Sequence, residues 1–395
     1  MKKLVLSTAV ALAMGSVAST AMAEDIKLGV FLGFTGPIES TVANMGPAAE
    51  QAIAEVNDSG KLLGGSKVEG VRADTTCVDA AAATAAIERL ITSDKVSGVI
   101  GGDCSGVTTA ALTNVAVPNG MVMISPSATS PALSTVEDNG FFFRTAPSDA
   151  RQGVVMTEVI TGKGIKEVAL TYTNNDYGKG LADAFQTAFE AAGGTVTISA
   201  AHEDGKADYS AEVGALASAG GEVLVVAGYL DQGGKGIIQG SLDTGAFDTF
   251  VLPDGMAGDS LPEAIGPDLN GSFGQTPGTD SPGAGKLSEM ANGYDGSSPF
   301  AAETYDAAAL IMLAMQAAGS TDPNKYKDKV MDVANAPGEQ IFPGDLAKGL
   351  EILAGGGDID YVGASNVELI GPGESAGNYR EFEIKDGKMS TVGYR

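Results

Sequence analysis

The chain alternates β-rich runs with segments of helical periodicity, and this order constrains its fold more than any other feature. Residues 26–34 (IKLGVFLGF) have the composition of a strand that ends in a Thr-Gly-Pro turn. The next segment places Ala49, Ile53 and Val56 on one helix face before a glycine ends it. Strands that alternate with helices predict parallel sheets, wound right-handed and covered by helices on both faces.

The alternation forms two series, and each is too short for a barrel of eight units. Strands are expected at 26–34, 96–100 and 121–125 in the first series, and at 167–173, 195–200, 222–228 and 249–254 in the second. Stretches rich in Gly, Pro and Ser at 274–285 and 293–299 interrupt the pattern before a long helix over 300–318. We therefore predict an α/β fold of two doubly wound parallel-sheet lobes joined by a multi-crossing hinge.

The lobes are assigned to four segments of the chain. Residues 24–145 and 276–362 are predicted to form the first lobe, and residues 146–275 and 363–395 the second. Residues 381–392 are expected to form a hairpin that turns at an Asp-Gly pair.

Residues 1–23 have the features of a secretory signal peptide. A basic start (MKK) precedes a short apolar stretch, and AMA forms a small-residue cleavage site. We expect cleavage after Ala23, which leaves 372 of the 395 residues. The mature chain would begin at Glu24 and be a soluble periplasmic protein.

The sequence is strongly acidic, with 50 Asp and Glu against 24 Lys and Arg. Loss of the two leader lysines would take the formal charge from −26 to −28. A surface of this sign repels nucleic acid and anionic lipid, so neither is expected as a partner. Such a composition is typical of a solvated surface suited to solubility or to a salty habitat.

Residues 97–110 (SGVIGGDCSGVTTA) join a predicted strand to a predicted helix. We consider four interpretations of this segment: a phosphate site, a catalytic site that cleaves a bond, a disulfide and a site for a small ligand. Neither a P-loop nor a dinucleotide-binding spacing occurs here, which argues against a phosphate. A Ser or Cys nucleophile needs a positioned base, and the one histidine, His202, lies in a polar stretch expected to be a surface loop. We expect no enzyme activity, no metal and no cofactor.

Cys77 and Cys104 are the only two cysteines. In an exported chain an even pair favours one disulfide, because thiols oxidise there. Two free buried thiols are the alternative that spacing alone leaves open.

Polar and aromatic side chains follow several predicted strands, at the ends where open α/β sheets bind ligands. They are Ser105, Thr108, Thr109, Ser125, Ser127 and Thr129 in the first lobe, and Tyr177, Tyr229 and Asp254 in the second. Hydroxyls beside a helix N-terminus suit a carboxylate, and Asp254 suits an ammonium group. The pattern predicts a clamp for a zwitterion; the alternative is that Ser and Thr only cap helices and Asp254 is a solvated turn acid.

At these residues the chain resembles the periplasmic leucine/isoleucine/valine-binding proteins, which serve ABC importers and have the type I periplasmic binding fold. The resemblance covers essentially the whole mature chain. It rests on the order and spacing of GFTGP (33–37), EVNDSG (55–60), TTC (75–77), GGDCSG (101–106), ISPSATSPAL (124–133), FFFRTAPSD (141–149), NNDYGKG (174–180), ADYSAEV (207–213) and AGYLDQG (227–233).

The resemblance implies how an amino acid would be held. Its carboxylate would bind the loop of Ser105 and the hydroxyl-rich loop of Ser127 and Thr129. Its ammonium would bind a carbonyl near Ala128 and the carboxylate of Asp254.

The resemblance also implies that Tyr177 and Tyr229 close the cleft from the second lobe. Cys77 and Cys104 would form a disulfide, as they do in relatives. Cys104 would then be structural, and its neighbour Ser105 would contact the ligand.

Two positions depart from the family pattern at the side-chain pocket. Thr41, with Glu39 nearby, stands where branched-chain binders present an aromatic residue. Asp103 stands where they present an aliphatic one. An unpaired acid in the pocket would favour a polar, cationic or larger side chain over leucine, whereas an Asp103 that points to solvent would not affect the choice. Amides, urea, aromatic acids and other small carboxylates remain open as ligands.

The leading hypothesis is a monomeric binding protein that passes its ligand to an ABC permease in the inner membrane. A sensory protein that presents its ligand to a receptor is the second hypothesis. The third is a cleft enzyme that acts on an amino-acid amide or ester, and the missing nucleophile–base pair counts against it.

Overall fold

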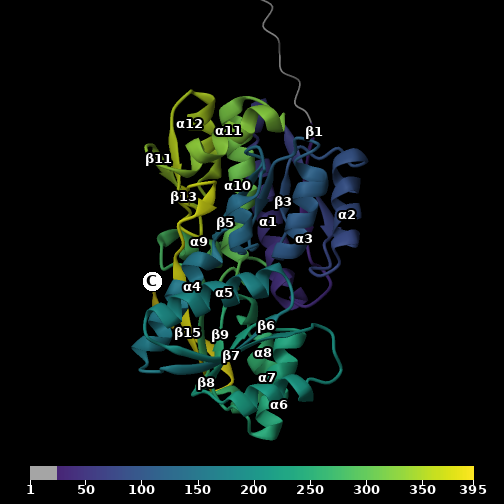
Figure 1. Ribbon diagram of the computed structural model, residues 1–395. Coiled ribbons are helices and arrows are strands. Elements are labelled where there is room, and N and C mark those ends of the chain that lie inside the picture. The colour runs from purple at the N-terminus through teal and green to yellow at the C-terminus, as the bar shows by residue number, and fades with distance from the viewer. Residues whose placement is uncertain (1–24) are drawn as a thin grey trace, which may run out of the picture.

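The computed structural model describes residues 25–395, which form two lobes, each built on a seven-stranded sheet (Figure 1). The predicted leader, its cleavage after Ala23 and the start at Glu24 lie outside the described residues. Helices cover both faces of the sheets, so the α/β two-lobe prediction is confirmed. No helix among residues 25–395 is both long and apolar enough to span a bilayer.

The first-lobe sheet has the order β13-β14-β5-β4-β3-β1-β2. Its strands are β1 (Asp25–Leu32), β2 (Lys67–Asp74), β3 (Val99–Gly101), β4 (Met123–Ser125), β5 (Phe142–Pro147), β13 (Leu369–Ile370) and β14 (Glu374–Ser375). Its helices include α1 (Glu39–Ser59), α2 (Ala80–Thr92), α3 (Ser105–Ala111), α10 (Ala301–Ala318), α11 (Pro323–Ala334) and α12 (Leu346–Ala354). A small sheet of β11 (Glu339–Ile341) and β12 (Ile359–Tyr361) lies beside them.

The second-lobe sheet has the order β16-β15-β10-β9-β8-β6-β7. Its strands are β6 (Glu167–Thr173), β7 (Thr195–His202), β8 (Val223–Ala227), β9 (Phe250–Leu252), β10 (Phe273–Pro277), β15 (Tyr379–Lys385) and β16 (Lys388–Tyr394). Its helices are α4 (Asp149–Gly162), α5 (Asp176–Ala191), α6 (Ser210–Ala219), α7 (Gly233–Thr244) and α8 (Ser260–Ile265), and α9 (Pro282–Met290) follows the return crossing. The predicted hairpin is β15–β16, with Asp386 and Gly387 at positive φ in its turn.

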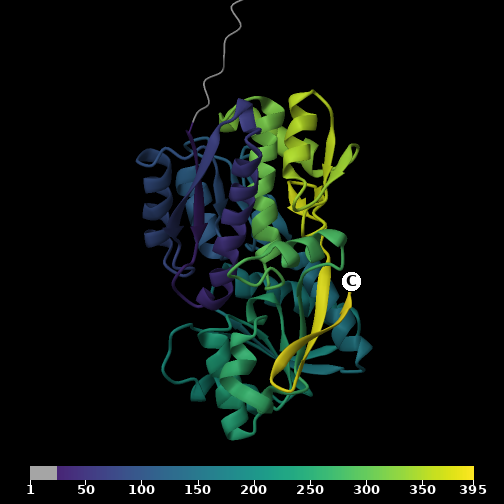
Figure 2. The same ribbon diagram turned by 180° about the vertical axis from the view of Figure 1, so that it is seen from behind.

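The long helix α10 returns the chain to the first lobe, as expected. It is apolar on nearly every side and packs against β3, β4, β5 and α1. A helix of this kind is stable only inside a core, which explains its central place in the upper lobe (Figure 2).

The chain crosses between the lobes three times, after β5, after β10 and after β14. The boundary predicted at 363 is wrong, because β13 and β14 still pair with the first-lobe sheet and the crossing follows Ser375. The C-terminal segment then enters the lower lobe as β15 (Figure 2). These three connections form the hinge between the lobes.

Candidate ligand-binding site

The strand ends of the two sheets meet at a small cavity between the lobes. The first lobe lines it with Ile38, Thr41, Asp103, Cys104, Ser105, Ser127 and Phe300, and the second with Tyr177, Tyr229, Asp254 and Gly255. Seven of the side chains predicted from sequence are therefore brought together: Thr41, Asp103, Ser105, Ser127, Tyr177, Tyr229 and Asp254.

Asp103 follows β3 and is buried, but its carboxylate is turned toward its own lobe. Its Oδ2 accepts a hydrogen bond from the Gly33 amide at 2.7 Å, and its Oδ1 accepts one from the Thr75 hydroxyl at 2.7 Å. Burial raises the pKa of Asp103, and these hydrogen bonds lower it. Asp103 lines the cavity, as predicted, but it is neither unpaired nor turned to solvent, because its carboxylate ties together the loops after β1, β2 and β3.

The backbone before Asp103 requires glycine. Gly101 has a φ of +134°, and a Cβ there would lie 2.0 Å from the carbonyl oxygen of Phe31. This close approach brings the end of β3 against β1 and sets the direction of the loop that follows.

The disulfide between Cys77 and Cys104 joins the loop after β2 to the start of α3. The predicted pairing is therefore present, and Ser105 follows it directly at the cavity wall. The Ser105 Oγ accepts a hydrogen bond from the Ser130 amide at 3.1 Å. Ser127 donates its hydroxyl to the Asp103 carbonyl at 3.1 Å, which fixes the second hydroxyl loop against the first.

The second-lobe wall is built around Asp254. Its Oδ1 accepts hydrogen bonds from the Tyr177 hydroxyl at 2.7 Å and from the Gly255 amide at 2.9 Å. Tyr177 stacks on Tyr229, with ring centroids 5.2 Å apart. Glycine is required at 255, because a Cβ there would lie 2.6 Å from the Tyr177 hydroxyl.

A second buried acid, Asp149 at the start of α4, lies behind Asp254 and was not predicted as a site residue. Its carboxylate lies beside the Thr129 hydroxyl, and the side-chain amide of Gln152 lies beside the Asp254 carboxylate. Burial and the charge of Asp254 raise the pKa of Asp149 well above its usual value, whereas Thr129 and Arg144 lower it. Burial also raises the pKa of Asp254. Two buried acids therefore lie close together at this end of the cavity.

The apolar part of the lining was also missed from sequence. Ile38 precedes α1, and Phe300 precedes α10 with a φ of +62°, a conformation that bulky residues rarely adopt. Strained residues of this kind concentrate at binding sites. Neither residue directly follows a strand, so the positions of the predicted strand ends do not identify them.

A model of the family described as periplasmic binding protein matches residues 25–344. The chain belongs to this family. The Leu/Ile/Val-binding protein of Escherichia coli is 30% identical over 270 residues, 68% of this chain and 71% of its own. The chemotactic signal transduction system substrate-binding protein BasB of Halobacterium salinarum is 26% identical over 93% of this chain and 89% of its own.

Solved structures share the fold of this periplasmic binding protein. The branched-chain amino acid transporter substrate-binding protein LivJ of Streptococcus pneumoniae, in complex with isoleucine, gives a TM-score of 0.76 at 22% identity. The match covers 93% of this chain and 99% of the other. The resemblance found in the sequence is confirmed.

Two predicted residues of this periplasmic binding protein, Ala128 and Thr129, lie outside the cavity lining. The Ala128 carbonyl accepts a hydrogen bond from the Arg144 guanidinium at 3.0 Å. This bond directs it to a buried cation of its own lobe, so the geometry does not support its expected contact with a ligand ammonium. The Thr129 side chain is buried beside Asp149.

His202 is not in a surface loop, as predicted, but is buried at the end of β7. Its Nδ1 lies 2.9 Å from the Thr171 hydroxyl, and its ring meets Tyr209 edge-on. The polar residues that follow it in sequence form the loop, while β7 pairing with β6 draws His202 into the sheet.

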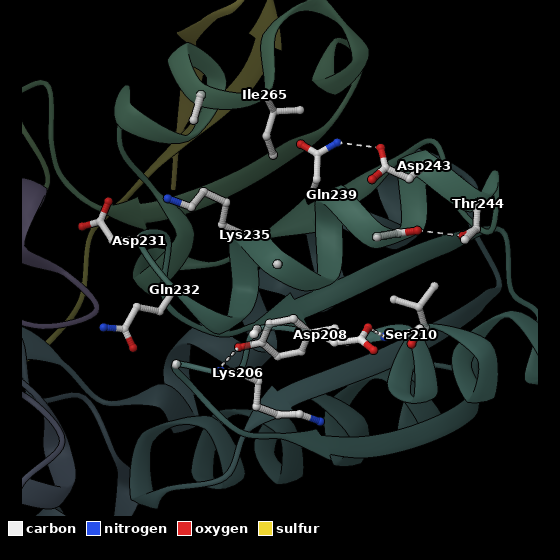
Figure 3. A pocket seen from close by; sticks show the side chains of 17 residues that line it. Lys206, Asp208, Ser210, Asp231, Gln232, Lys235, Gln239, Asp243, Thr244 and Ile265 are labelled. Carbon is white, nitrogen blue, oxygen red and sulfur yellow. Dashed lines mark hydrogen bonds between the residues drawn. The ribbon is translucent and has the colours of Figure 1, made fainter.

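A larger hollow lies on the outside of the second lobe, between residues 205–210 and α7 (Figure 3). It is lined by one lobe alone, so a ligand bound there would not bridge the lobes. No group of three or more His, Cys, Asp or Glu in residues 25–395 has the arrangement of a metal site.

Proposed function

We propose that this protein is the substrate-binding component of an ABC importer and that it closes its lobes around an amino acid in the periplasm. One observation carries the proposal: the buried acid Asp254 and its partner Tyr177 stand on one wall of the cavity, opposite the hydroxyls of Ser105 and Ser127 on the other. A zwitterion spans such a cavity with one charge on each lobe.

The cationic end of the ligand would bind Asp254. The Asp254 and Asp149 carboxylates share a buried region that raises the pKa of each, so a positive charge placed there relieves their repulsion. A ligand ammonium supplies this charge together with hydrogen-bond donors.

The carboxylate end would bind the first lobe. The Ser105 oxygen already accepts a hydrogen bond from a backbone amide, which leaves its own hydrogen to donate. Ser105 also begins α3, where backbone N–H groups point out of the helix.

The side chain of the ligand would be apolar. Ile38 and Phe300 line the cavity, and the Asp103 carboxylate is occupied by Gly33 and Thr75. The Escherichia coli relative is named for leucine, isoleucine and valine, and the Streptococcus pneumoniae protein is in complex with isoleucine. We therefore favour a branched-chain amino acid over a cationic one.

Ligand binding would drive transport by lobe closure. Contacts to both walls exist only when the lobes are closed, so the ligand stabilises that form. The closed form of a monomer would then dock on a permease in the inner membrane. The mechanism requires no cofactor and no covalent step.

A thermal-shift screen tests the proposal. Leucine, isoleucine, valine, phenylalanine, glutamine, arginine and benzoate are compared, because a ligand at about 100 times its Kd stabilises the native state by roughly 2.7 kcal/mol. We expect the branched-chain amino acids to give the largest shifts and 4-methylpentanoate, which is leucine without its ammonium, to give little. A panel in which no amino acid shifts the melting temperature contradicts the proposal.

A sensory ligand-binding protein is the second candidate. It is favoured by the match to the chemotactic protein BasB, which extends over 93% of this chain. Both candidates use the same cavity, and only the docking partner differs. Purified closed protein that stimulates a reconstituted permease supports the importer, whereas binding to a membrane receptor supports the sensor.

A further inference from the structure

Asp231 of the second lobe contacts Ser40 of the first, which is next in the chain to the cavity residue Thr41. The Asp231 Oδ2 accepts hydrogen bonds from the Ser40 amide at 3.0 Å and the Ser40 hydroxyl at 2.7 Å. The Asp231 amide donates to the Pro37 carbonyl at 3.1 Å. None of these three residues lines the ligand cavity.

Ser260 completes the contact from the second lobe. Its hydroxyl donates to the Asp231 Oδ1 at 3.2 Å, and its Oγ lies 3.1 Å from the Ser40 Oγ. Figure 3 shows Asp231 at the edge of the outer hollow, on the side of the purple N-terminal part of the chain. Its carboxylate therefore faces the other lobe.

Ser40 is the second residue of α1, a helix of 21 residues. The residue at the N-cap position is Ile38, whose side chain makes no capping hydrogen bond. Cap side chains normally accept from the second or third amide of a helix, and the Asp231 carboxylate does so here from the other lobe. It also places a negative charge at the positive end of the helix.

We propose that Asp231 is an N-cap supplied across the cleft, a latch that holds the lobes closed and slows ligand release without touching the ligand. When the lobes separate, α1 loses this cap and Asp231 returns to water. The latch rests on the proposed function because it assumes that lobe closure retains a ligand. The interlobe contact itself does not depend on which ligand is bound.

The first experiment measures release of L-leucine and L-isoleucine by stopped flow and calorimetry. Asp231→Ala should release them roughly 10- to 100-fold faster, as expected for the loss of a cap and of hydrogen bonds to a charged group. Ser40→Ala, which keeps the backbone amide, should have a smaller effect. Asp243→Ala is the matched control, because Asp243 lies on α7 of the same lobe and its side chain accepts a hydrogen bond from Gln239 on the same helix.

The second experiment requires no ligand. Both native cysteines are in the disulfide, so Ser40→Cys with Ser260→Cys introduces the only thiol pair, at positions whose Oγ atoms are 3.1 Å apart. Added oxidised glutathione should accept the two electrons and convert the pair to a disulfide in the closed form, and adding Asp231→Ala should slow this oxidation by a similar 10- to 100-fold. Adding Asp243→Ala should not slow it.

The outcomes separate the two proposals. Equal release rates and equal oxidation rates with and without Asp231 overturn the latch. If Asp231→Ala slows oxidation but the wild type binds neither amino acid, the latch stands and the choice of ligand in the proposed function fails.

Discussion

The Tyr177 hydroxyl donates to Asp254 at 2.7 Å, and both residues are buried at the wall of the interlobe cavity. Tyr177 is the second residue of α5, the helix that follows β6, whereas Asp254 follows β9. The contact fixes one carboxylate oxygen of Asp254 and holds the carboxylate beside the cavity. A positive ligand group, as we propose, would offset the cost of burying a charged acceptor in this position.

Asp254→Ala should weaken binding of an amino-acid ligand by roughly 30-fold to several thousandfold. Removal of one partner of a buried charge pair costs about 2 to 5 kcal/mol, and each 1.4 kcal/mol is tenfold in affinity. Titration calorimetry with leucine measures the loss. Tyr177→Phe should cost less, since it removes a hydrogen bond and leaves the charge.

The deaminated analogue is the control for this substitution. 4-Methylpentanoate should bind the wild type poorly and be indifferent to Asp254→Ala. If the variant binds leucine as tightly as the wild type, the ligand ammonium does not contact Asp254.

Ligand affinity should fall as the pH is lowered from 7 toward 4. Burial raises the pKa of Asp149 and of Asp254, so in the closed cavity without ligand the pair takes up protons at a higher pH than ordinary aspartates do. A ligand ammonium favours the ionised carboxylates, and binding at acidic pH must therefore release a proton. Calorimetry in buffers of different ionisation enthalpy measures this release.

Asp149→Asn removes one member of the pair and should make the pH dependence of binding shallower. Asp243→Ala, on the surface of the same lobe, should leave it unchanged. A leucine affinity that is constant from pH 4 to 7, with no proton release, would show that the pair does not sense the ligand charge.

Asp103→Leu should destabilise the fold rather than change the ligand preference. It leaves the Gly33 amide and the Thr75 hydroxyl without their acceptor, and each buried unpaired group costs about 1 to 3 kcal/mol. Urea unfolding of the ligand-free protein measures the loss. An unchanged unfolding free energy together with tighter leucine binding would show that Asp103 acts on the ligand rather than on the fold.

Much of the fold could be predicted from periodicity alone. The long buried strands β1, β6 and β8 and the helices between them have clear patterns, and they determine a two-lobe parallel architecture. The missed strands have weaker patterns for physical reasons. β2 is a largely exposed edge strand that contains Gly70, and β10 buries Gln275 and Thr276.

The crossing after β14 was misplaced for a similar reason. β13 and β14 have two residues each, too few to show any periodicity. Their place in the first sheet depends on pairing with β5, more than 200 residues earlier in the chain.

The site was predictable where its residues follow strands. Ser105, Tyr177 and Asp254 lie at the carboxyl ends of parallel strands, and sheet topology brings these ends to one edge. The direction of a side chain could not be predicted in this way, because it depends on residues that are far away in the sequence. Asp103 turns toward Gly33, 70 residues away, and Asp149 lies beside Asp254 only because the chain crosses the hinge after β5.

The buried His202 should give this protein an acid sensitivity of its own. Burial lowers the pKa of His202 to about 4, against an ordinary value of 6.5. Between these values the unfolded chain binds a proton that the folded chain excludes, so this contribution to stability is complete above pH 6.5 and is lost as the pH falls toward 4. The loss amounts to roughly 3 kcal/mol.

The carboxylates also titrate at low pH, so the effect of His202 must be separated from theirs. The His202→Gln variant, which removes only this proton, is compared with the wild type by urea unfolding at pH 7, 5.5 and 4. The variant should show a shallower fall in unfolding free energy by about that amount. Parallel pH profiles for the two proteins would mean that His202 is protonated as readily in the folded chain as in the unfolded one.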